Sequence, residues 1–174
     1  MIEPHSKGLI QIYTGDGKGK TTAALGIALR ASGHGLKVIF IQFIKGIATG
    51  EHKFIQKYLP FEIVQLSSGN CFQKNGEQLG KEVKQTLEFT REILLGSKYD
   101  MVILDEIFIA LSQNLITTKD IMDLLDMKPD TVELVLTGRN APPEIVQRAD
   151  LVTEMLMIKH PFNEGITGRL GIEY

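Results

Sequence analysis

Eight consecutive residues have the types and spacing of a phosphate-binding loop. They follow an apolar run at residues 9–13 and precede an Ala- and Leu-rich segment, and their sequence is Gly15-Asp16-Gly17-Lys18-Gly19-Lys20-Thr21-Thr22. Glycines permit a tight turn whose backbone N–H groups converge on phosphate oxygens, and the following helix adds a partial positive charge. Lys20 would supply a cation, and Thr21 a hydroxyl for Mg²⁺. The alternative is a strand-to-helix turn without a ligand.

The loop departs from the usual pattern Gly-x-x-x-x-Gly-Lys-Ser/Thr. Thr14 stands where that pattern has its first glycine, and Gly15 comes one position late. We therefore interpret the stretch as a variant P-loop, in which the phosphate site is kept but the class of enzyme is left open. We expect the Lys20 side chain to be solvated when no phosphate is bound.

Two acids follow the apolar residues 101–104. Asp105 and Glu106 at the end of such a strand match the carboxylates that accompany a P-loop. Carboxylates in this position can hold Mg²⁺ and its waters beside the phosphates. The alternative is a solvated acidic pair at the end of an ordinary strand.

Apolar periodicity predicts alternating strands and helices along the whole chain. The expected strands are residues 9–14, 38–43, 61–66, 101–105, 132–136 and 151–158, and the expected helices are 21–32, 52–59, 77–95, 107–115, 118–127 and 144–149. The alternation favours a doubly wound, mainly parallel, six-stranded α/β domain of P-loop NTPase-like (RecA-like) architecture. We expect one domain over residues 1–174 with a flexible tail at 1–7, and we expect the continuous apolar strand 38–43 to be a parallel neighbour of the first strand.

Composition narrows the function classes. A net charge of -2 gives no whole-molecule attraction for nucleic acid or an anionic membrane, and no apolar run approaches the ~20 residues that span a bilayer. A single cysteine, Cys71, excludes an internal disulfide, and no leader pattern is seen, so we expect a cytoplasmic protein. His5, His34, His52 and His160 lack metal-ligand spacing, which argues against zinc.

Six stretches together resemble the P-loop corrinoid adenosyltransferases. They are GDGKGKTTAALG at 15–26, VILDEI at 102–107, LTGRNAPPE at 136–144, ADLVTEM at 149–155, IKHP at 158–161 and the terminal GIEY. The resemblance covers nearly the whole chain, and the loop without its first glycine is similar to this family's own loop. It implies that the Co(I) of a reduced corrinoid attacks the ribose 5′-carbon of ATP and that triphosphate leaves. It also implies adenosylcobalamin biosynthesis or salvage, a homodimer and a reduced flavoprotein as electron donor.

The resemblance assigns roles to individual residues. Residues 15–22 match the triphosphate cradle, with Lys20 as its charge partner. Thr21 and Glu106 match Mg²⁺ ligands, and Asp105 would act through water. Arg139 is expected to contact a phosphate, since a planar guanidinium suits phosphate oxygens, or else to pair with a nearby acid. Arg30 matches a family position near the nucleotide, although from the sequence alone it is simply an arginine on a helix face.

The corrinoid side departs further from the family. Some members have Gly-x-Gly-Phe-Thr-Trp in the loop that meets the lower face of the corrinoid, and this chain has GNCFQK at 69–74. Phe72 is retained, whereas Lys74 replaces the tryptophan. Cys71 is either a cobalt ligand or a small buried hydrophobe.

Two other functions use the same loop. A phosphotransferase or NTP hydrolase would act on the γ-phosphate and form ADP. A non-enzymatic, ATP-dependent binding module would bind ATP without turnover, even with reduced corrinoid present.

Overall fold

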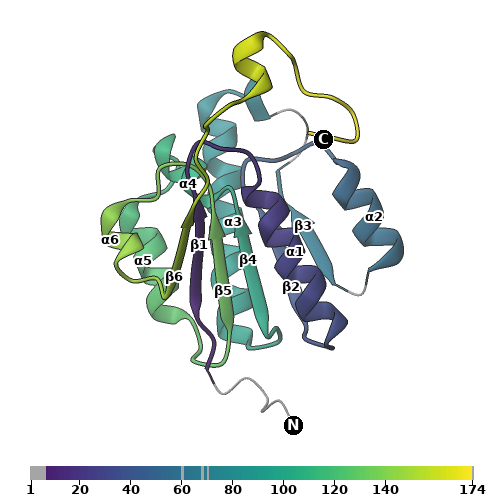
Figure 1. Cartoon of the computed structure of the whole chain (residues 1–174). Helices are drawn as coiled ribbons and strands as arrows, with labels where there is room; N and C mark the ends of the chain where they lie inside the picture. The colour runs from purple at the N-terminus through teal and green to yellow at the C-terminus, as the bar shows by residue number, and fades with distance from the viewer. Residues whose placement is uncertain (1–6, 60, 68, 70, 174) are drawn as a thin grey trace.

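The six strands form one parallel sheet. The computed structural model describes residues 7–173 except 60, 68 and 70, so most of the predicted tail at 1–7 lies outside the described residues. The sheet order is β3-β2-β4-β5-β1-β6 (Figure 1). The strands are β1 (Ile10–Thr14), β2 (Val38–Gln42), β3 (Glu62–Gln65), β4 (Met101–Asp105), β5 (Glu133–Thr137) and β6 (Leu151–Glu154). Every pairing is parallel, which confirms the predicted α/β class.

One predicted neighbour is wrong. The first strand, β1, pairs with β5 and β6, whereas β2 pairs with β3 and β4, so that β4 and β5 lie between β2 and β1. The apolar run of β2 shows that the strand is buried on both faces, and all five of its residues are indeed buried. Burial does not specify which strand lies alongside, because β4 and β5 are buried throughout as well.

The helices cover both faces of the sheet. They are α1 (Lys20–Gly33), α2 (Gly50–Tyr58), α3 (Gly76–Gly96), α4 (Ile107–Ser112), α5 (Thr118–Met127) and α6 (Pro143–Val146). Alternate residues of the strands enter two separate cores: Phe40 and Ile103 pack with α1, whereas Ile41 and Leu104 pack with α3. Figure 1 shows α1 and α3 on opposite sides of the sheet. The architecture is therefore doubly wound.

Every helix starts within two residues of its predicted start, but the predictions that α4 reaches residue 115 and that α6 reaches residue 149 are wrong: these helices end at Ser112 and Val146. Thr117 caps α5 in a reciprocal bond with Asp120. The final strand was predicted to reach residue 158 but ends at Glu154. Its partner β1 ends opposite at Thr14, where the glycine loop turns away, so residues beyond Glu154 have no strand to pair with.

The chain after β6 crosses the carboxyl edge of the sheet. It makes a 3-10 turn at Pro161–Glu164 and ends near α2 (Figure 1). Several apolar side chains of this segment are exposed, including Ile158 at 91% and Leu170 at 80%. The segment therefore lies over the edge where ligands of open α/β sheets bind. Among the helices of the described residues, none is both long and apolar enough to cross a membrane.

Candidate active site

The glycine loop joins the end of β1 to the start of α1. Gly19 has φ 122°, in the left-handed region, and precedes the first helical residue. Gly17 lies against the chain that follows β6: its N–H donates to the Met155 carbonyl at 2.7 Å, and a Cβ added to it would come within 2.7 Å of that oxygen. The loop is thus held in place by a segment about 140 residues later in the chain.

Lys20 folds back into the centre of this loop. Its Nζ donates to the Gly15 carbonyl at 2.7 Å and to the Gly17 carbonyl at 2.9 Å. Only 8% of the residue is exposed, so the prediction of a solvated side chain is wrong. The loop carbonyls replace the water molecules that would otherwise solvate the ammonium. Burial lowers the pKa of Lys20, while the negative charge of Glu106 acts in the opposite direction.

Thr21 and Asp105 are joined by a hydrogen bond. The Thr21 hydroxyl donates to Oδ1 of Asp105 at 2.9 Å, and Asp105 is completely buried. Asp105 is therefore not the solvated acid that we considered as an alternative. Gln42 and Thr137 also donate to its carboxylate, at 2.9 and 2.7 Å. Buried carboxylates require this number of donors, because desolvation is otherwise too costly.

Glu106, unlike Asp105, has a carboxylate oxygen that lacks a hydrogen-bond partner among the described residues. It has a left-handed backbone, with φ 61°, at the start of α4. Its Oε2 atom is buried and has no hydrogen-bond partner among the described residues. Burial raises the pKa of Glu106, and the charge of Asp105 raises it further. A buried oxygen without a partner at a strained residue suggests a ligand at this position.

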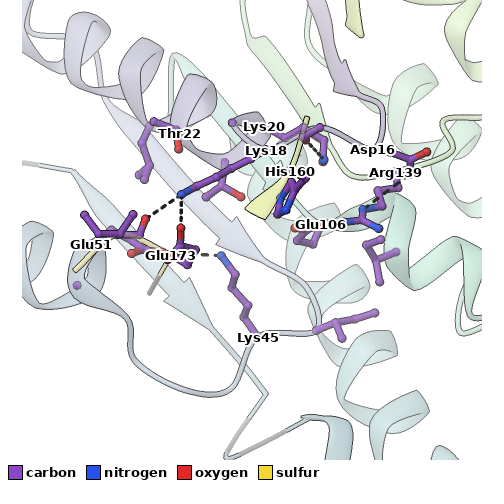
Figure 2. A pocket seen from close by; sticks show the side chains of 18 of the residues that line it. Asp16, Lys18, Lys20, Thr22, Lys45, Glu51, Glu106, Arg139, His160 and Glu173 are labelled. Atoms are coloured by element: carbon purple, nitrogen blue, oxygen red, sulfur yellow. Dashed lines mark hydrogen bonds and ion pairs between the residues drawn. The ribbon is translucent and has the colours of Figure 1, made fainter. Parts of the chain in front are cut away.

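A cleft of about 740 Å³ brings these groups together, within the volume range typical of small-molecule sites (Figure 2). The predicted residues that line it are Asp16, Gly17, Lys18, Gly19, Lys20, Thr21, Thr22, Glu106 and Arg139. Gly15 and Asp105 lie behind this surface, bonded to Lys20 and Thr21 respectively. Arg139 makes only a loose contact with Asp16, with its Nε 3.9 Å from Oδ1, and both side chains are more than half exposed.

Arg30 does not join the cleft. It lies in the last turn of α1, whereas the glycine loop precedes the first turn. Its side chain is exposed and is not among the lining residues. The structure therefore gives no geometric support for a contact between Arg30 and the nucleotide.

Among the lining residues that were not predicted, four have titratable side chains: Lys45, Glu51, His160 and Glu173. Lys45 Nζ lies 3.5 Å from Oδ2 of Asp105 and 3.7 Å from Oε1 of Glu51. Lys45 follows Ile44, whose φ of 50° is unusual for a β-branched residue. The sequence signal that could have identified Lys45 is its place just after the carboxyl end of the predicted strand 38–43. Lys18, in the loop, reaches Glu173 near the end of the chain: its Nζ lies 2.9 Å from Oε1 of Glu173 (Figure 2).

Comparison with known proteins identifies the family. The sequence profile of the family described as ATP:corrinoid adenosyltransferase BtuR/CobO/CobP matches residues 6–174. The chain belongs to this family. A corrinoid adenosyltransferase from Sinorhizobium sp is 39% identical over 173 residues, covering 97% of this chain and 81% of the relative. The corrinoid adenosyltransferase of Escherichia coli K12 is 33% identical over 171 residues, covering 97% and 86%, and CobA of Salmonella typhimurium is 32% identical with the same coverage. The predicted family and enzyme class are confirmed.

The loop that distinguishes this adenosyltransferase from some relatives has its own packing. Phe72 lies in the 3-10 turn Cys71–Gln73, and its side chain lies outside the described part of the structure. Cys71 is buried, and burial raises the pKa of its thiol, as expected of a small buried hydrophobe. Lys74, at the tryptophan position, forms an ion pair with Glu82 of α3, and their side chains are only 8% and 13% exposed. In this member of the family, a buried ion pair therefore anchors the end of the loop.

Proposed function

We propose that this chain transfers the 5′-deoxyadenosyl group of ATP to the Co(I) of a reduced corrinoid and releases intact triphosphate. The observation that carries this proposal is the position of Lys20, whose ammonium already lies inside the loop, bonded to the carbonyls of Gly15 and Gly17. Such a cation can exchange carbonyl oxygens for phosphate oxygens without leaving the loop. The attacking nucleophile is the substrate's own cobalt, so the protein is required to bind, orient and exclude water.

The loop is suited to a leaving group that departs in one piece. The first N–H groups of α1 have no partner within the helix and face the loop, where they favour an anion. Lys20, Lys18 and Arg139 line the same cleft, so cations are distributed along it. We propose that these groups hold the triphosphate while the ribose 5′-carbon faces the corrinoid. Charge that develops on the leaving oxygen is then stabilised by donors that are already in place.

The acids at the cleft fit Mg²⁺. Thr21 gives its hydrogen to Asp105, which leaves the lone pairs of its oxygen available to a cation. Glu106 offers a buried Oε2 without a partner among the described residues. We propose that Thr21 and Glu106 would hold the ion and that Asp105 would act through water. When bound, Mg²⁺ supplies charge neutralisation for the triphosphate.

The described residues do not enclose such an ion by themselves. Within the described residues, no group of three or more His, Cys, Asp or Glu could hold a metal. Mg²⁺ commonly takes one or two protein ligands and completes its shell with phosphate oxygens and water. The arrangement therefore suits an ion that arrives with ATP.

Three further features concern what the protein contacts: the corrinoid, the electron donor and a second copy of the chain. We propose that the loop with Phe72 meets the lower face of the corrinoid, and that a reduced flavoprotein in the cytoplasm supplies the electrons. A homodimer is supported by the exposed apolar side chains of β6 and the following segment, such as Leu151 at 41%, Leu156 at 67% and Phe162 at 73%. Apolar side chains that gather on a protein surface commonly mark an interface.

The bond of ATP that breaks tests the proposed reaction. Phosphorus NMR of an anaerobic reaction with ATP, Mg²⁺ and chemically reduced corrinoid should show triphosphate in an amount equal to the 5′-deoxyadenosyl-corrinoid formed. ADP and free phosphate should stay near the level of a control without enzyme. ADP that accumulates with product, or at the same rate without corrinoid, would instead establish the phosphotransferase or hydrolase. ATP binding without any turnover would establish the binding module.

A further inference from the structure

A row of polar side chains, three of them completely buried, crosses four neighbouring strands at the carboxyl edge of the sheet. We name Gln65 of β3, Gln42 of β2, Asp105 of β4 and Thr137 of β5 the polar row. Gln42 is in register with both Gln65 and Asp105, and Thr137 follows the last registered pair of β4 and β5, Leu104 and Leu136. Gln42, Asp105 and Thr137 are completely buried. Each therefore depends on its neighbours for hydrogen bonds.

The row is bonded from end to end. Gln65 Nε2 donates to Gln42 Oε1 at 3.0 Å, and Gln42 Nε2 donates to Asp105 Oδ2 at 2.9 Å. On the other side, the Thr137 hydroxyl donates to Asp105 Oδ1 at 2.7 Å. Asp105 is thus held by side chains of both neighbouring strands, and neither of its oxygens can rotate away without leaving a buried donor unpaired.

Thr137 does more than bind Asp105. While its hydroxyl donates to Asp105, its oxygen accepts the backbone N–H of Glu106 at 2.9 Å. One hydroxyl therefore fixes the side chain of the first acid and the main chain of the second. The contact is made rigid by Gly138, where an added Cβ would come within 2.7 Å of the Phe108 Cβ in the first turn of α4. At this point β5 and α4 are too close to shift independently.

We propose that Thr137 is a positioning residue for the Mg²⁺–triphosphate site, because its single hydroxyl sets the relative placement of Asp105 and Glu106. Asp105 in turn orients the Thr21 hydroxyl, so Thr137 acts on Thr21 and Glu106 together without contacting the nucleotide. The inference rests on the proposed function, in that the two acids must serve an ion that accompanies ATP. Partners that orient ligands typically contribute about 10–100-fold to metal affinity or activity.

The test is ATP binding measured by calorimetry on the full chain, in Mg²⁺ and in EDTA, without corrinoid and therefore without turnover. The quantity compared is the gain in ATP affinity that Mg²⁺ provides. Thr137→Val removes the hydroxyl at nearly constant shape, and Thr137→Ser keeps it. We expect the gain to fall by at least about tenfold in Thr137→Val, to stay within about threefold of wild type in Thr137→Ser, and affinity in EDTA to change little in either variant. Thr137→Ala serves as a second variant without the hydroxyl, and thermal unfolding is measured for each.

The outcomes separate this inference from the proposed function. If the wild type gains no ATP affinity from Mg²⁺, the proposed metal site fails and the role of Thr137 fails with it. If the wild type shows the gain and Thr137→Val keeps it, only the positioning role is overturned. Equal losses in Mg²⁺ and EDTA, or failure of both variants without the hydroxyl to fold, would make Thr137 a structural residue and would also overturn the inference.

Discussion

Replacing Lys20 by alanine is the most direct test of the loop, because it should affect stability and catalysis by different amounts. In the free protein the change removes two charged hydrogen bonds, to the Gly15 carbonyl at 2.7 Å and the Gly17 carbonyl at 2.9 Å. Hydrogen bonds to charged groups contribute about 1.5–3 kcal/mol each. Burial of the ammonium, which lowers the pKa of Lys20, offsets part of that sum.

We therefore expect a net loss of about 1–2 kcal/mol of unfolding free energy, since charged bonds are partly cancelled by desolvation. For a chain of this size, each kcal/mol lowers Tm by about 2–4 °C. Catalysis should fall much more, because one preorganised group opposite a developing negative charge contributes about 2.7–4 kcal/mol, or 10²–10³-fold in rate.

The assay is the anaerobic rate of adenosylcorrinoid formation with chemically reduced corrinoid, paired with a thermal melt of the same preparation. Lys81→Ala is the matched control, since Lys81 is 72% exposed on α3 and forms an ion pair with the exposed Glu77 one turn away. It should leave both measurements unchanged. A folded Lys20→Ala protein whose rate stays within about threefold of wild type would refute the role of this ammonium in the reaction.

Three further substitutions separate binding from structure. Arg139→Ala should lower kcat/KM about tenfold or more while Tm changes little, because the exposed 3.9 Å contact with Asp16 is worth at most about 1 kcal/mol. A fall in Tm without a change in rate would show that Arg139 is a structural residue. Lys74→Ala should lower the unfolding free energy by about 3 kcal/mol, because it leaves Glu82 buried without its partner. Denaturant titration measures this loss, and a loss below about 1 kcal/mol would contradict the role of the ion pair. Phe72→Ala should slow reaction with corrinoids that carry a lower axial ligand more than with pre-reduced ones, and equal slowing of both would mark Phe72 as a plain packing residue.

Features that depend on neighbouring residues in the sequence could be predicted well. The glycines of the loop, the helix after it and the strand that ends in Asp105 are local patterns, and each was found where expected. The acids were predicted from their place after an apolar strand. Backbone preference and apolar periodicity fix such elements before any tertiary contact is made.

Features that depend on distant segments could not be predicted in this way. The position of β2 in the sheet depends on which strands pair. The carbonyls that bury Lys20 are close in sequence, but the loop that presents them is held by a hydrogen bond from Gly17 to Met155 after β6. Glu173 reaches Lys18 only because the chain crosses the sheet after β6. The Thr137 hydroxyl has no sequence signal, since a threonine that ends a strand is common. These contacts join residues that are far apart in the sequence.

The position of β1 has a consequence for how the protein is made. The strand that leads into the phosphate loop precedes the other five strands in the sequence, yet its two partners, β5 and β6, follow all of the others. A nascent chain therefore carries β1 without its neighbours until more than 120 further residues have been synthesised. Exposed strand edges of this kind favour aggregation, and pairing across such long separations is slow. We expect the enzyme to depend on chaperones during synthesis, and to acquire its nucleotide site only after β5 and β6 have emerged from the ribosome.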